Sequence, residues 1–329
     1  MLLGGCGSTD APARGSPSGT GGAANQDGGA TATGGATATG DAGAAVSRAE
    51  QAAATDPLCT AITPFYFQIG DVHGMLVGDS EGGSRFTAST DMEIASASKW
   101  LFGAYIVERF QHDLSAIDDK AMTMRSGYTS LVYAACVTSK SVQACFDAAN
   151  NSTYTAKNDG LFFYNGGHFQ KYAIDLGMGA FGNTELTNEL KSLLGQELPF
   201  TFKSPQLAGG ASASADGYAM FLRKILSGGL AIHDHLGENA VCTLPGSCAT
   251  AASSPAAPEA WHYSYGHWIE DDPMNGDGTF SSPGYYGFYP WIDASKRYYG
   301  IVARYSLATT AYVESARCGR VIRDAFFGR

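Results

Sequence analysis

The sequence predicts an α+β domain whose antiparallel sheet is built from both chain ends and flanked by helices, with a helical insertion domain between the two sheet-forming parts. Runs rich in β-branched and aromatic residues follow position 65 and return after position 285, and the chain between them is mostly helical in pattern. Strands, then helices, then strands and a final helix is the order of this class. We therefore expect a sheet-containing lobe from residues 55–125 and 255–329, and a helical lobe from residues 126–254.

The first elements of the domain are a predicted hairpin and a predicted helix. Residues 65–69 and 73–77 are short β-prone runs around Gly70 and Asp71, a pair typical of a hairpin turn, and residues 84–87 are expected to add a third strand. From residue 96 to residue 110 apolar residues recur at helical spacing, which predicts a helix with one buried face.

The later elements return to strands and end on a helix. Residues 212–226 carry an apolar stripe at helical spacing, and the glycine pair that follows predicts the end of this helix. Residues 285–292 and 298–305 are aromatic and β-branched runs joined by a polar turn, which predicts two strands, and residues 312–327 predict a closing helix.

The first 54 residues differ sharply in composition from the rest. Between Leu3 and Val46 there is no Leu, Ile, Val, Met, Phe, Tyr or Trp, so we expect a flexible tether that cannot offset its ordering entropy by burial. Residues 2–6 resemble the lipobox at which bacterial lipoproteins are cleaved and acylated on a cysteine, here Cys6. The charged start and apolar stretch of a signal peptide are missing, so we expect an earlier start codon; a chance cysteine in a low-complexity leader is the alternative.

Cysteine usage indicates the compartment. Beside Cys6 there are six cysteines, and loop length alone favours pairing Cys136 with Cys145, Cys242 with Cys248, and Cys59 with Cys318. The spacings do not match a zinc site, and an oxidising compartment explains them better. We expect an exported protein, either periplasmic or an outer-membrane lipoprotein whose only membrane contact is a lipid on Cys6. A net charge of −10 leaves no positive surplus for binding nucleic acid.

The candidate chemistry begins at Ser96-Ala97-Ser98-Lys99, a Ser-x-x-Lys pattern in the first turn of a predicted helix. Residues three apart lie on one helical face, so the Lys99 amine can reach the Ser96 hydroxyl, whereas Ser98 points elsewhere. A serine becomes a nucleophile when a neighbouring base takes its proton, and a desolvated lysine can be that base. The start of the helix also offers backbone N–H groups to a developing oxyanion.

Several further segments, in order, resemble the family of serine β-lactamases, penicillin-binding proteins and their esterase relatives from Phe65 to Arg329. The segments are Leu114 to Asp119, Leu207-Ala208-Gly209-Gly210, Tyr265-Gly266-His267-Trp268, and Gly284-Tyr285-Tyr286-Gly287 through Trp291-Ile292-Asp293. Class C β-lactamases and family VIII esterases are the most similar in pattern. The resemblance implies the β-lactamase/transpeptidase-like fold, with Ser96 as nucleophile and Lys99 beside it.

Two other motifs of the family are altered in this chain. Phe163-Tyr164-Asn165 stands where the family has Tyr-x-Asn or Ser-x-Asn, so either Tyr164 handles the proton after a local shift, or Asn165 alone works with Lys99. Ser282-Pro283-Gly284 stands where the family has Lys-Thr-Gly or His-x-Gly. The resemblance implies substrate contacts from Asn165, Ser282, Gly284 and Tyr285, with the Tyr285 N–H as second oxyanion donor. The missing cation makes penicillin a less favoured substrate.

The predicted function is a serine hydrolase that cleaves an ester or amide through an acyl-enzyme on Ser96, with Lys99 and Tyr164 moving the proton. Its substrate could be a β-lactam, a D-amino-acid peptide or a carboxylic ester. We expect no cofactor, no metal, a small-molecule or peptide substrate, and a monomer. The alternative is a catalytically weak protein of this fold, kept on the cell surface in a binding or structural role.

Overall fold

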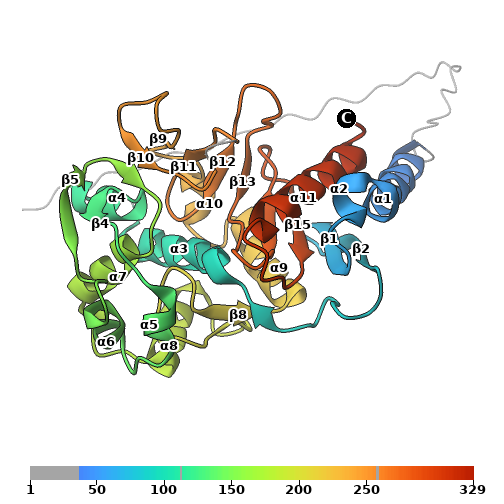
Figure 1. Cartoon of the computed structure of the whole chain (residues 1–329). Coiled ribbons are helices and arrows are strands. Elements are labelled where there is room, and N and C mark those ends of the chain that lie inside the picture. Colours follow the sequence, from blue (N-terminus) through green and yellow to red (C-terminus); the bar gives the residue numbers. More distant parts are fainter. Residues whose placement is uncertain (1–36, 112, 257–258) are drawn as a thin grey trace, which may run out of the picture. The chain divides into compact units, whose positions relative to one another are not determined.

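The computed structural model describes residues 37–111, 113–256 and 259–329, and residues 41–329 form one compact unit. Its main sheet has, within these residues, eight strands in which every neighbouring pair is antiparallel. The first and last parts of the unit lie next to each other in this sheet, because β1 pairs with β15. The predicted α+β class is therefore confirmed. In spatial order the strands are β2 (Met75–Glu81), β1 (Phe65–Asp71), β15 (Tyr298–Ala303), β14 (Tyr289–Ile292), β13 (Thr279–Ser281), β12 (Trp268–Glu270), β11 (His262–Tyr263) and β9 (Val241–Cys242) (Figure 1).

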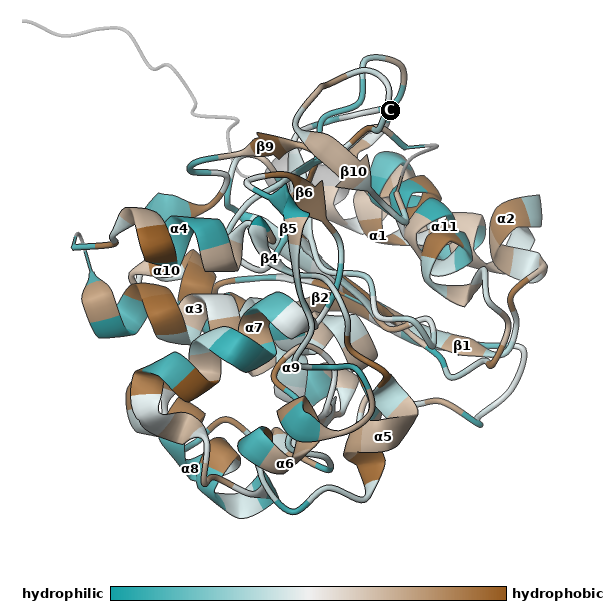
Figure 2. Ribbon diagram, turned by 60° about the vertical axis from the view of Figure 1, so that its left-hand side comes forward, coloured by the Kyte–Doolittle hydropathy of each residue, from teal (hydrophilic) through white to brown (hydrophobic). Residues whose placement is uncertain are grey.

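Helices cover both faces of this sheet. On one face lies the last helix, α11 (Ala311–Phe327), with α2 (Pro57–Thr60) against it, and on the other lies α9 (Ala215–Leu226) (Figure 2). The predicted apolar stripe of α9, from Tyr218 to Ile225, is buried, and Ser214 caps the helix by accepting a hydrogen bond from Gly217 N. β1 is buried along its first six residues, which is why it is mostly apolar, whereas the edge strand β2 is mostly exposed or half-buried.

The central helix, α3 (Ser98–Phe110), carries the Ser-x-x-Lys segment into the core, and its first ten residues are all buried. The region between α3 and α9 is built from short helices and small sheets, as expected from its many glycine breaks. Its helices are α4 (Ala116–Met122), α5 (Tyr133–Val137), α6 (Val142–Asp147), α7 (Gly167–Ala173) with the π-helical turn Ile174–Met178, and α8 (Asn183–Leu194); α10 (Ile232–His235) follows α9. The small sheets contain β3 (Met92–Glu93), β4 (Ser126–Tyr128), β5 (Tyr154–Asp159), β6 (Phe162–Phe163), β7 (Thr201–Phe202), β8 (Ala211–Ala213) and β10 (Ala251–Ser253).

The prediction of a flexible tether is wrong for its C-terminal part. Residues predicted to be unstructured form α1 (Thr37–Thr55), in which Ala49 and Ala53 are fully buried. Alanine has the highest helix propensity, and its small side chain lets a helix pack closely without large apolar residues, which the composition argument overlooked. Arg48 donates hydrogen bonds to the carbonyl oxygens of Ala325 and Phe326 at the end of α11. The lipobox-like segment with Cys6 lies outside the described residues.

Three other sequence expectations differ from the structure. Residues 84–87 form turns rather than a strand, and the strand expected over 285–292 begins only at Tyr289. The preceding residues form a tight turn closed by a hydrogen bond from Gly284 N to Phe288 O. The boundary of the helical lobe is also wrong, because α9 packs on the main sheet and β9 extends it, although both lie within residues 126–254. Hydrophobic pattern predicts a buried face but not the element that covers it.

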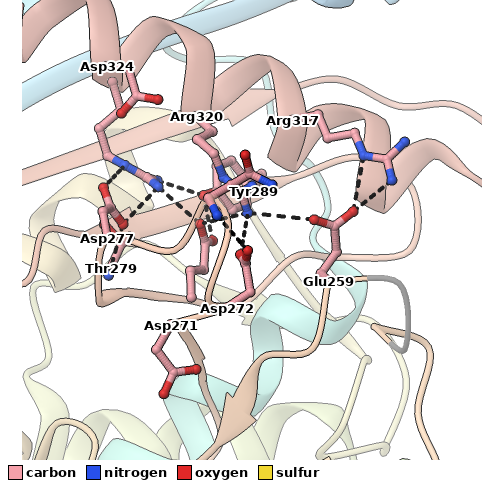
Figure 3. Close-up of polar contacts among 12 residues, drawn as sticks. Glu259, Asp271, Asp272, Asp277, Thr279, Tyr289, Arg317, Arg320 and Asp324 are labelled. Carbon is pink, nitrogen blue, oxygen red and sulfur yellow. Dashed lines mark hydrogen bonds and ion pairs between the residues drawn. The ribbon is translucent and has the colours of Figure 1, made fainter. Parts of the chain in front are cut away.

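A buried ion cluster joins α11 to the strands beneath it (Figure 3). Arg323 is fully buried, with its guanidinium 3.0 Å from Glu270 and 2.9 Å from Asp277, and it also donates a hydrogen bond to the Tyr289 hydroxyl. The neighbouring Arg320 pairs at 3.7 Å with both Glu270 and Glu259. Removing one partner of such a group would leave an uncompensated buried charge, so the cluster holds α11 in one position on the sheet.

The six described cysteines form the three predicted pairs: Cys59–Cys318, Cys136–Cys145 and Cys242–Cys248. The first bridge attaches α2 to the buried face of α11 across 259 residues of sequence. The other two close short loops, with separations of 9 and 6 residues.

We predict that the long bridge contributes far more to stability than the short one near β9. Loop-closure entropy gives about 5 kcal/mol for Cys59–Cys318 and about 2 kcal/mol for Cys242–Cys248. The double variants Cys59→Ala/Cys318→Ala and Cys242→Ala/Cys248→Ala, compared by urea unfolding, should differ by about 3 kcal/mol in free energy of unfolding. Equal losses in the two variants would contradict this expectation.

Candidate active site

Ser96 lies in a 3-10 turn, Ala95–Ala97, that leads directly into α3. The residue before it, Ala95, has φ of 44°, in the left-handed region that costs a non-glycine residue about 1 kcal/mol. Such strain persists only where the surroundings impose it, and it is found most often at functional sites. Ser96 itself is half-buried, whereas Ser98 is fully buried and accepts a hydrogen bond from Ala211 N. The two serines of the motif are therefore placed differently, and Ser98 has a structural role.

The Lys99 amine is in hydrogen-bond contact with Ser96. Its Nζ lies 2.9 Å from Ser96 Oγ and donates a hydrogen bond to the Ala208 carbonyl oxygen at 2.7 Å. The Lys99 side chain is almost completely buried, and no carboxylate within the described residues forms a salt bridge with it. Burial without a counter-charge lowers the pKa of Lys99 to about 7. A large fraction of the protein therefore carries a neutral amine beside the serine hydroxyl at neutral pH.

Tyr164 is the second group that reaches Ser96. Its ring lies 4.9 Å from Lys99 Nζ and stacks on Trp268 with ring centroids 5.1 Å apart. Burial raises the pKa of Tyr164 to about 12, and hydrogen bonds with the side chains of Ser96 and Trp268 act in the opposite direction. Of the two alternatives left open by the sequence, Tyr164 or Asn165, Tyr164 lines a cavity together with Ser96, whereas Asn165 lines neither cavity that contains Ser96. The backbone N–H of Phe163 donates to Met124 O.

His168 positions the segment that carries Tyr164. Its Nδ1 accepts a hydrogen bond from Ser126 N at 3.1 Å, so the proton lies on Nε2, which donates to Phe163 O at 2.9 Å. Burial lowers the pKa of His168 to about 4, and the ring therefore stays neutral at physiological pH. The sequence pattern assigned His168 no role, because its partner Ser126 lies 42 residues away along the chain.

The two expected oxyanion donors are free to bind a ligand. Within the described residues, the backbone N–H groups of Ser96 and Tyr285 donate to no backbone or side-chain acceptor. The turn that holds Tyr285 packs against the turn that holds Ser96, since a Cβ on Gly284 would lie 2.1 Å from Ile94 O. The glycine therefore permits a close approach between two parts of the backbone, rather than the approach of a substrate that the sequence suggested.

Two of the expected substrate contacts are occupied within the protein. Ser282 is buried, and its hydroxyl donates to Ser96 O at 3.1 Å and to Gly266 O at 3.4 Å, so it positions the nucleophile segment. The Asn165 side chain accepts a hydrogen bond from Gly167 N at 2.9 Å. Asn165 lines neither of the two cavities that contain Ser96.

Two cavities meet at Ser96 and Tyr285. The first, which we call the aromatic cavity, has about 390 Å³ of empty space and is lined mainly by aromatic and proline residues: Ser96, Tyr164, Pro255, Ala256, Trp261, Trp268, Pro283, Tyr285 and Tyr312. The second, which we call the tyrosine-rimmed cavity, has about 660 Å³ and is lined by Ala95, Ser96, Lys99, Leu131, Tyr133, Gly166, Gln206, Ala208, Gly209, Tyr285 and Tyr286. A carbonyl group at Ser96 could therefore extend one substituent into each cavity.

Sequence reasoning missed most of these lining residues. Trp261, Pro255 and Tyr312 come from segments with no motif of their own. Their aromatic or proline character is the only sequence signal that could have indicated a place in a cavity wall. Among the residues that the structure describes, no group of three His, Cys, Asp or Glu side chains comes together as metal ligands.

Comparison with known proteins shows the fold. No family model matches the chain, and no curated protein matches it by sequence. Among solved structures, a putative β-lactamase from Bacteroides dorei has a TM-score of 0.57 at 19% identity, covering 80% of this chain and 93% of that one. The hydrolase EstCE1, described as having promiscuous acyltransferase activity, has a TM-score of 0.60 at 13% identity, covering 88% and 100%. The octameric penicillin-binding protein homologue from Pyrococcus abyssi has a TM-score of 0.60 at 14% identity, covering 89% and 78%. The predicted β-lactamase/transpeptidase-like fold is confirmed.

We predict that the buried amine makes stability depend on pH. In the unfolded chain Lys99 binds a proton up to about its ordinary pKa of 10.5, whereas the folded protein releases it near pH 7. Burial of the charged Lys99 amine therefore lowers the free energy of unfolding by its full amount below about pH 7. This loss disappears as the pH rises toward 10.5. Relative to Lys99→Met, the wild-type free energy of unfolding should increase by about 1.4 kcal/mol per pH unit across this window. Urea unfolding of both proteins between pH 6 and 10 measures the difference, and a flat difference would contradict the depressed pKa.

Proposed function

We propose that this protein, which has the fold of serine hydrolases of the β-lactamase and penicillin-binding protein type, is itself a serine hydrolase that cleaves an ester or amide through an acyl-enzyme on Ser96. The observation that carries the proposal is the contact of 2.9 Å between Ser96 Oγ and a lysine whose pKa is lowered to about 7. A neutral amine at this distance can accept the hydroxyl proton, which is what a serine nucleophile needs.

The proposed first half-reaction joins the Ser96 hydroxyl, the Lys99 amine, two backbone N–H groups and the Tyr164 hydroxyl. Lys99 Nζ takes the proton from Ser96 Oγ as the oxygen attacks the substrate carbonyl carbon, and the backbone N–H groups of Ser96 and Tyr285 stabilise the oxyanion that forms. When the tetrahedral intermediate collapses, the bond to the leaving group breaks and that group receives a proton from the Lys99 ammonium through the Tyr164 hydroxyl. The Tyr164 pKa of about 12 keeps this hydroxyl protonated and able to donate.

The second half-reaction returns the enzyme to its starting state. Water gives a proton to the same base as its oxygen attacks the acyl-enzyme carbonyl, and the bond between Ser96 Oγ and the acyl carbon breaks. Ser96 Oγ regains its proton and the carboxylic acid is released. Water is the one co-reactant that these steps require, and the proton that Lys99 takes from it returns to Ser96 Oγ.

We also propose that the protein is exported. Three disulfides in one chain are compatible with an oxidising compartment and are rare where glutathione keeps thiols reduced. Within the described residues, no helix is both long and apolar enough to cross a bilayer.

We predict that covalent labelling depends on Ser96 and not on Ser98. Intact-protein mass spectrometry after exposure to penicillins, phenyl esters and short D-amino-acid peptides should show an acyl adduct on the wild type and none on Ser96→Ala. The matched control, Ser98→Ala, should keep most of its labelling, because that hydroxyl only accepts a hydrogen bond from Ala211 N. An active Ser96→Ala would refute the proposal. No adduct with any substrate would favour the catalytically weak alternative with a binding or structural role.

We predict an acid limb in the pH–rate profile. Only the neutral form of Lys99 can act as base, so kcat/KM should rise about 10-fold per pH unit below pH 7 and level off above it. The pKa of Tyr164 is too high to cause a decline below about pH 10. Stopped-flow acylation by a phenyl ester between pH 5 and 9 tests this, and a profile that falls with increasing pH would exclude Lys99 as the base.

A further inference from the structure

The rim of the tyrosine-rimmed cavity is an aromatic cluster built around one carboxylate. Tyr133 and Tyr305 donate hydrogen bonds from their hydroxyls to Glu93, at 3.2 and 3.4 Å. Tyr286 stacks on Tyr305 with ring centroids 4.6 Å apart, and Tyr285 meets Tyr286 edge to face at an interplanar angle of 82°. Three of these tyrosines, Tyr133, Tyr285 and Tyr286, line the cavity itself, together with Ser96.

The charge of this cluster is not neutralised by the protein. Within the described residues, no lysine, arginine or histidine forms a salt bridge with Glu93, whereas the neighbouring Asp91 pairs with Lys203 and Arg304, next to Tyr305, pairs with Glu314. Of the described residues that line either cavity at Ser96, Lys99 is the only basic one, and its lowered pKa leaves it largely neutral above pH 7. Glu93 does not line the tyrosine-rimmed cavity itself, but it accepts a hydrogen bond from Tyr133, which does. The carboxylate behind the rim and the faces of the rings around it both attract a cation.

This arrangement disfavours one kind of substrate and favours another. A carboxylate in the cavity would meet only Lys99 as a basic group among the described lining residues, and Lys99 is largely neutral above pH 7. Ser282, which stands where the resembled family has a cation, lines neither cavity and directs its hydroxyl to backbone oxygens. An ammonium group would instead meet aromatic faces, tyrosine oxygens and a nearby carboxylate, which together form the kind of site that binds organic cations. Glu93 and the proposed nucleophile are also close in sequence, since Glu93 precedes Ser96 by three residues.

We propose that the substrate carries a positively charged amine on the substituent that enters the tyrosine-rimmed cavity, where Glu93, Tyr133, Tyr285 and Tyr286 recognise it. The proposal rests on the proposed hydrolase activity. It narrows the substrates to esters or amides in which one substituent of the carbonyl group carries a positively charged amine. The aromatic cavity, whose walls are apolar, takes the uncharged substituent on the other side of the carbonyl group.

The test uses pairs of esters that differ only in charge. One pair has a 2-(trimethylammonio)ethyl or a 3,3-dimethylbutyl alcohol; the other is a 4-nitrophenyl ester with a 4-(trimethylammonio)butanoyl or a 5,5-dimethylhexanoyl acyl group. In at least one pair, kcat/KM of the wild type should be about 10-fold or more higher for the cationic ester, and added NaCl should reduce this ratio. A ratio near one in both pairs would overturn the proposal.

Variants at the rim separate charge from shape. Glu93→Gln should lower the cationic-to-neutral ratio about 10-fold, whereas Glu50→Gln, which removes the same charge from an exposed position on α1, should leave the ratio unchanged. Tyr286→Phe keeps the ring and should largely keep the ratio, but Tyr286→Leu should lower it. An unchanged ratio in both Glu93→Gln and Tyr286→Leu, with folding verified by circular dichroism, would refute the assignment.

A binding measurement keeps this proposal distinct from the proposed hydrolase activity. Calorimetric titration of Ser96→Ala with (2-hydroxyethyl)trimethylammonium and with 3,3-dimethylbutan-1-ol needs no turnover. Tighter binding of the cation, lost in Ser96→Ala/Glu93→Gln, would support the site even if no ester were hydrolysed, in which case only the hydrolase proposal fails. Hydrolysis of neutral esters without any preference for the cation would refute the site and retain the hydrolase.

Discussion

Burial of the Lys99 amine is the constraint from which the rest of the site follows. The amine is desolvated because α3 is pressed against the turn before β12 with no space for a side chain between them. A Cβ on Gly103 would lie 2.2 Å from Tyr265 O, and one on Gly266 would lie 2.2 Å from Lys99 O. Two glycines thus allow the backbones to touch beside Lys99, and burial of its amine without a counter-charge lowers the pKa.

The same packing fixes what lies around the amine. The Ala208 carbonyl accepts one Lys99 hydrogen bond and Ser96 Oγ occupies the other direction, so the lysine is held by two polar contacts at the end of an otherwise apolar environment. Ser98 and Ser282 use their hydroxyls to join the nucleophile turn to its neighbours. These contacts are local, short and buried. Of the two serines in the motif, Ser96 is the one whose side chain faces the cavities.

The walls of the cavities depend on a different part of the fold. Tyr312 stands at the start of α11 and donates a hydrogen bond to Pro255 O, and Arg317 from the same helix pairs with Glu259 at 2.7 Å. Because the ion cluster and the Cys59–Cys318 bridge hold α11 on the sheet, they also hold one wall of the aromatic cavity. Stability of the sheet face and the shape of the candidate site are thus connected through one helix.

The sequence alone predicted the class of fold, the two short-range cysteine pairs and the approach of Lys99 to Ser96, because periodicity and short spacings are local properties of a chain. The Cys59–Cys318 pair followed only as the two cysteines that remained. The tertiary structure decided what depends on distant residues. It folded the alanine-rich segment as α1, brought Tyr164 rather than Phe163 to Ser96, directed Ser282 away from the cavities, and joined Glu93 to tyrosines more than 30 residues away. Apart from the helix propensity of alanine in α1, these outcomes have no local signal, since each depends on which backbone or side chain packs opposite.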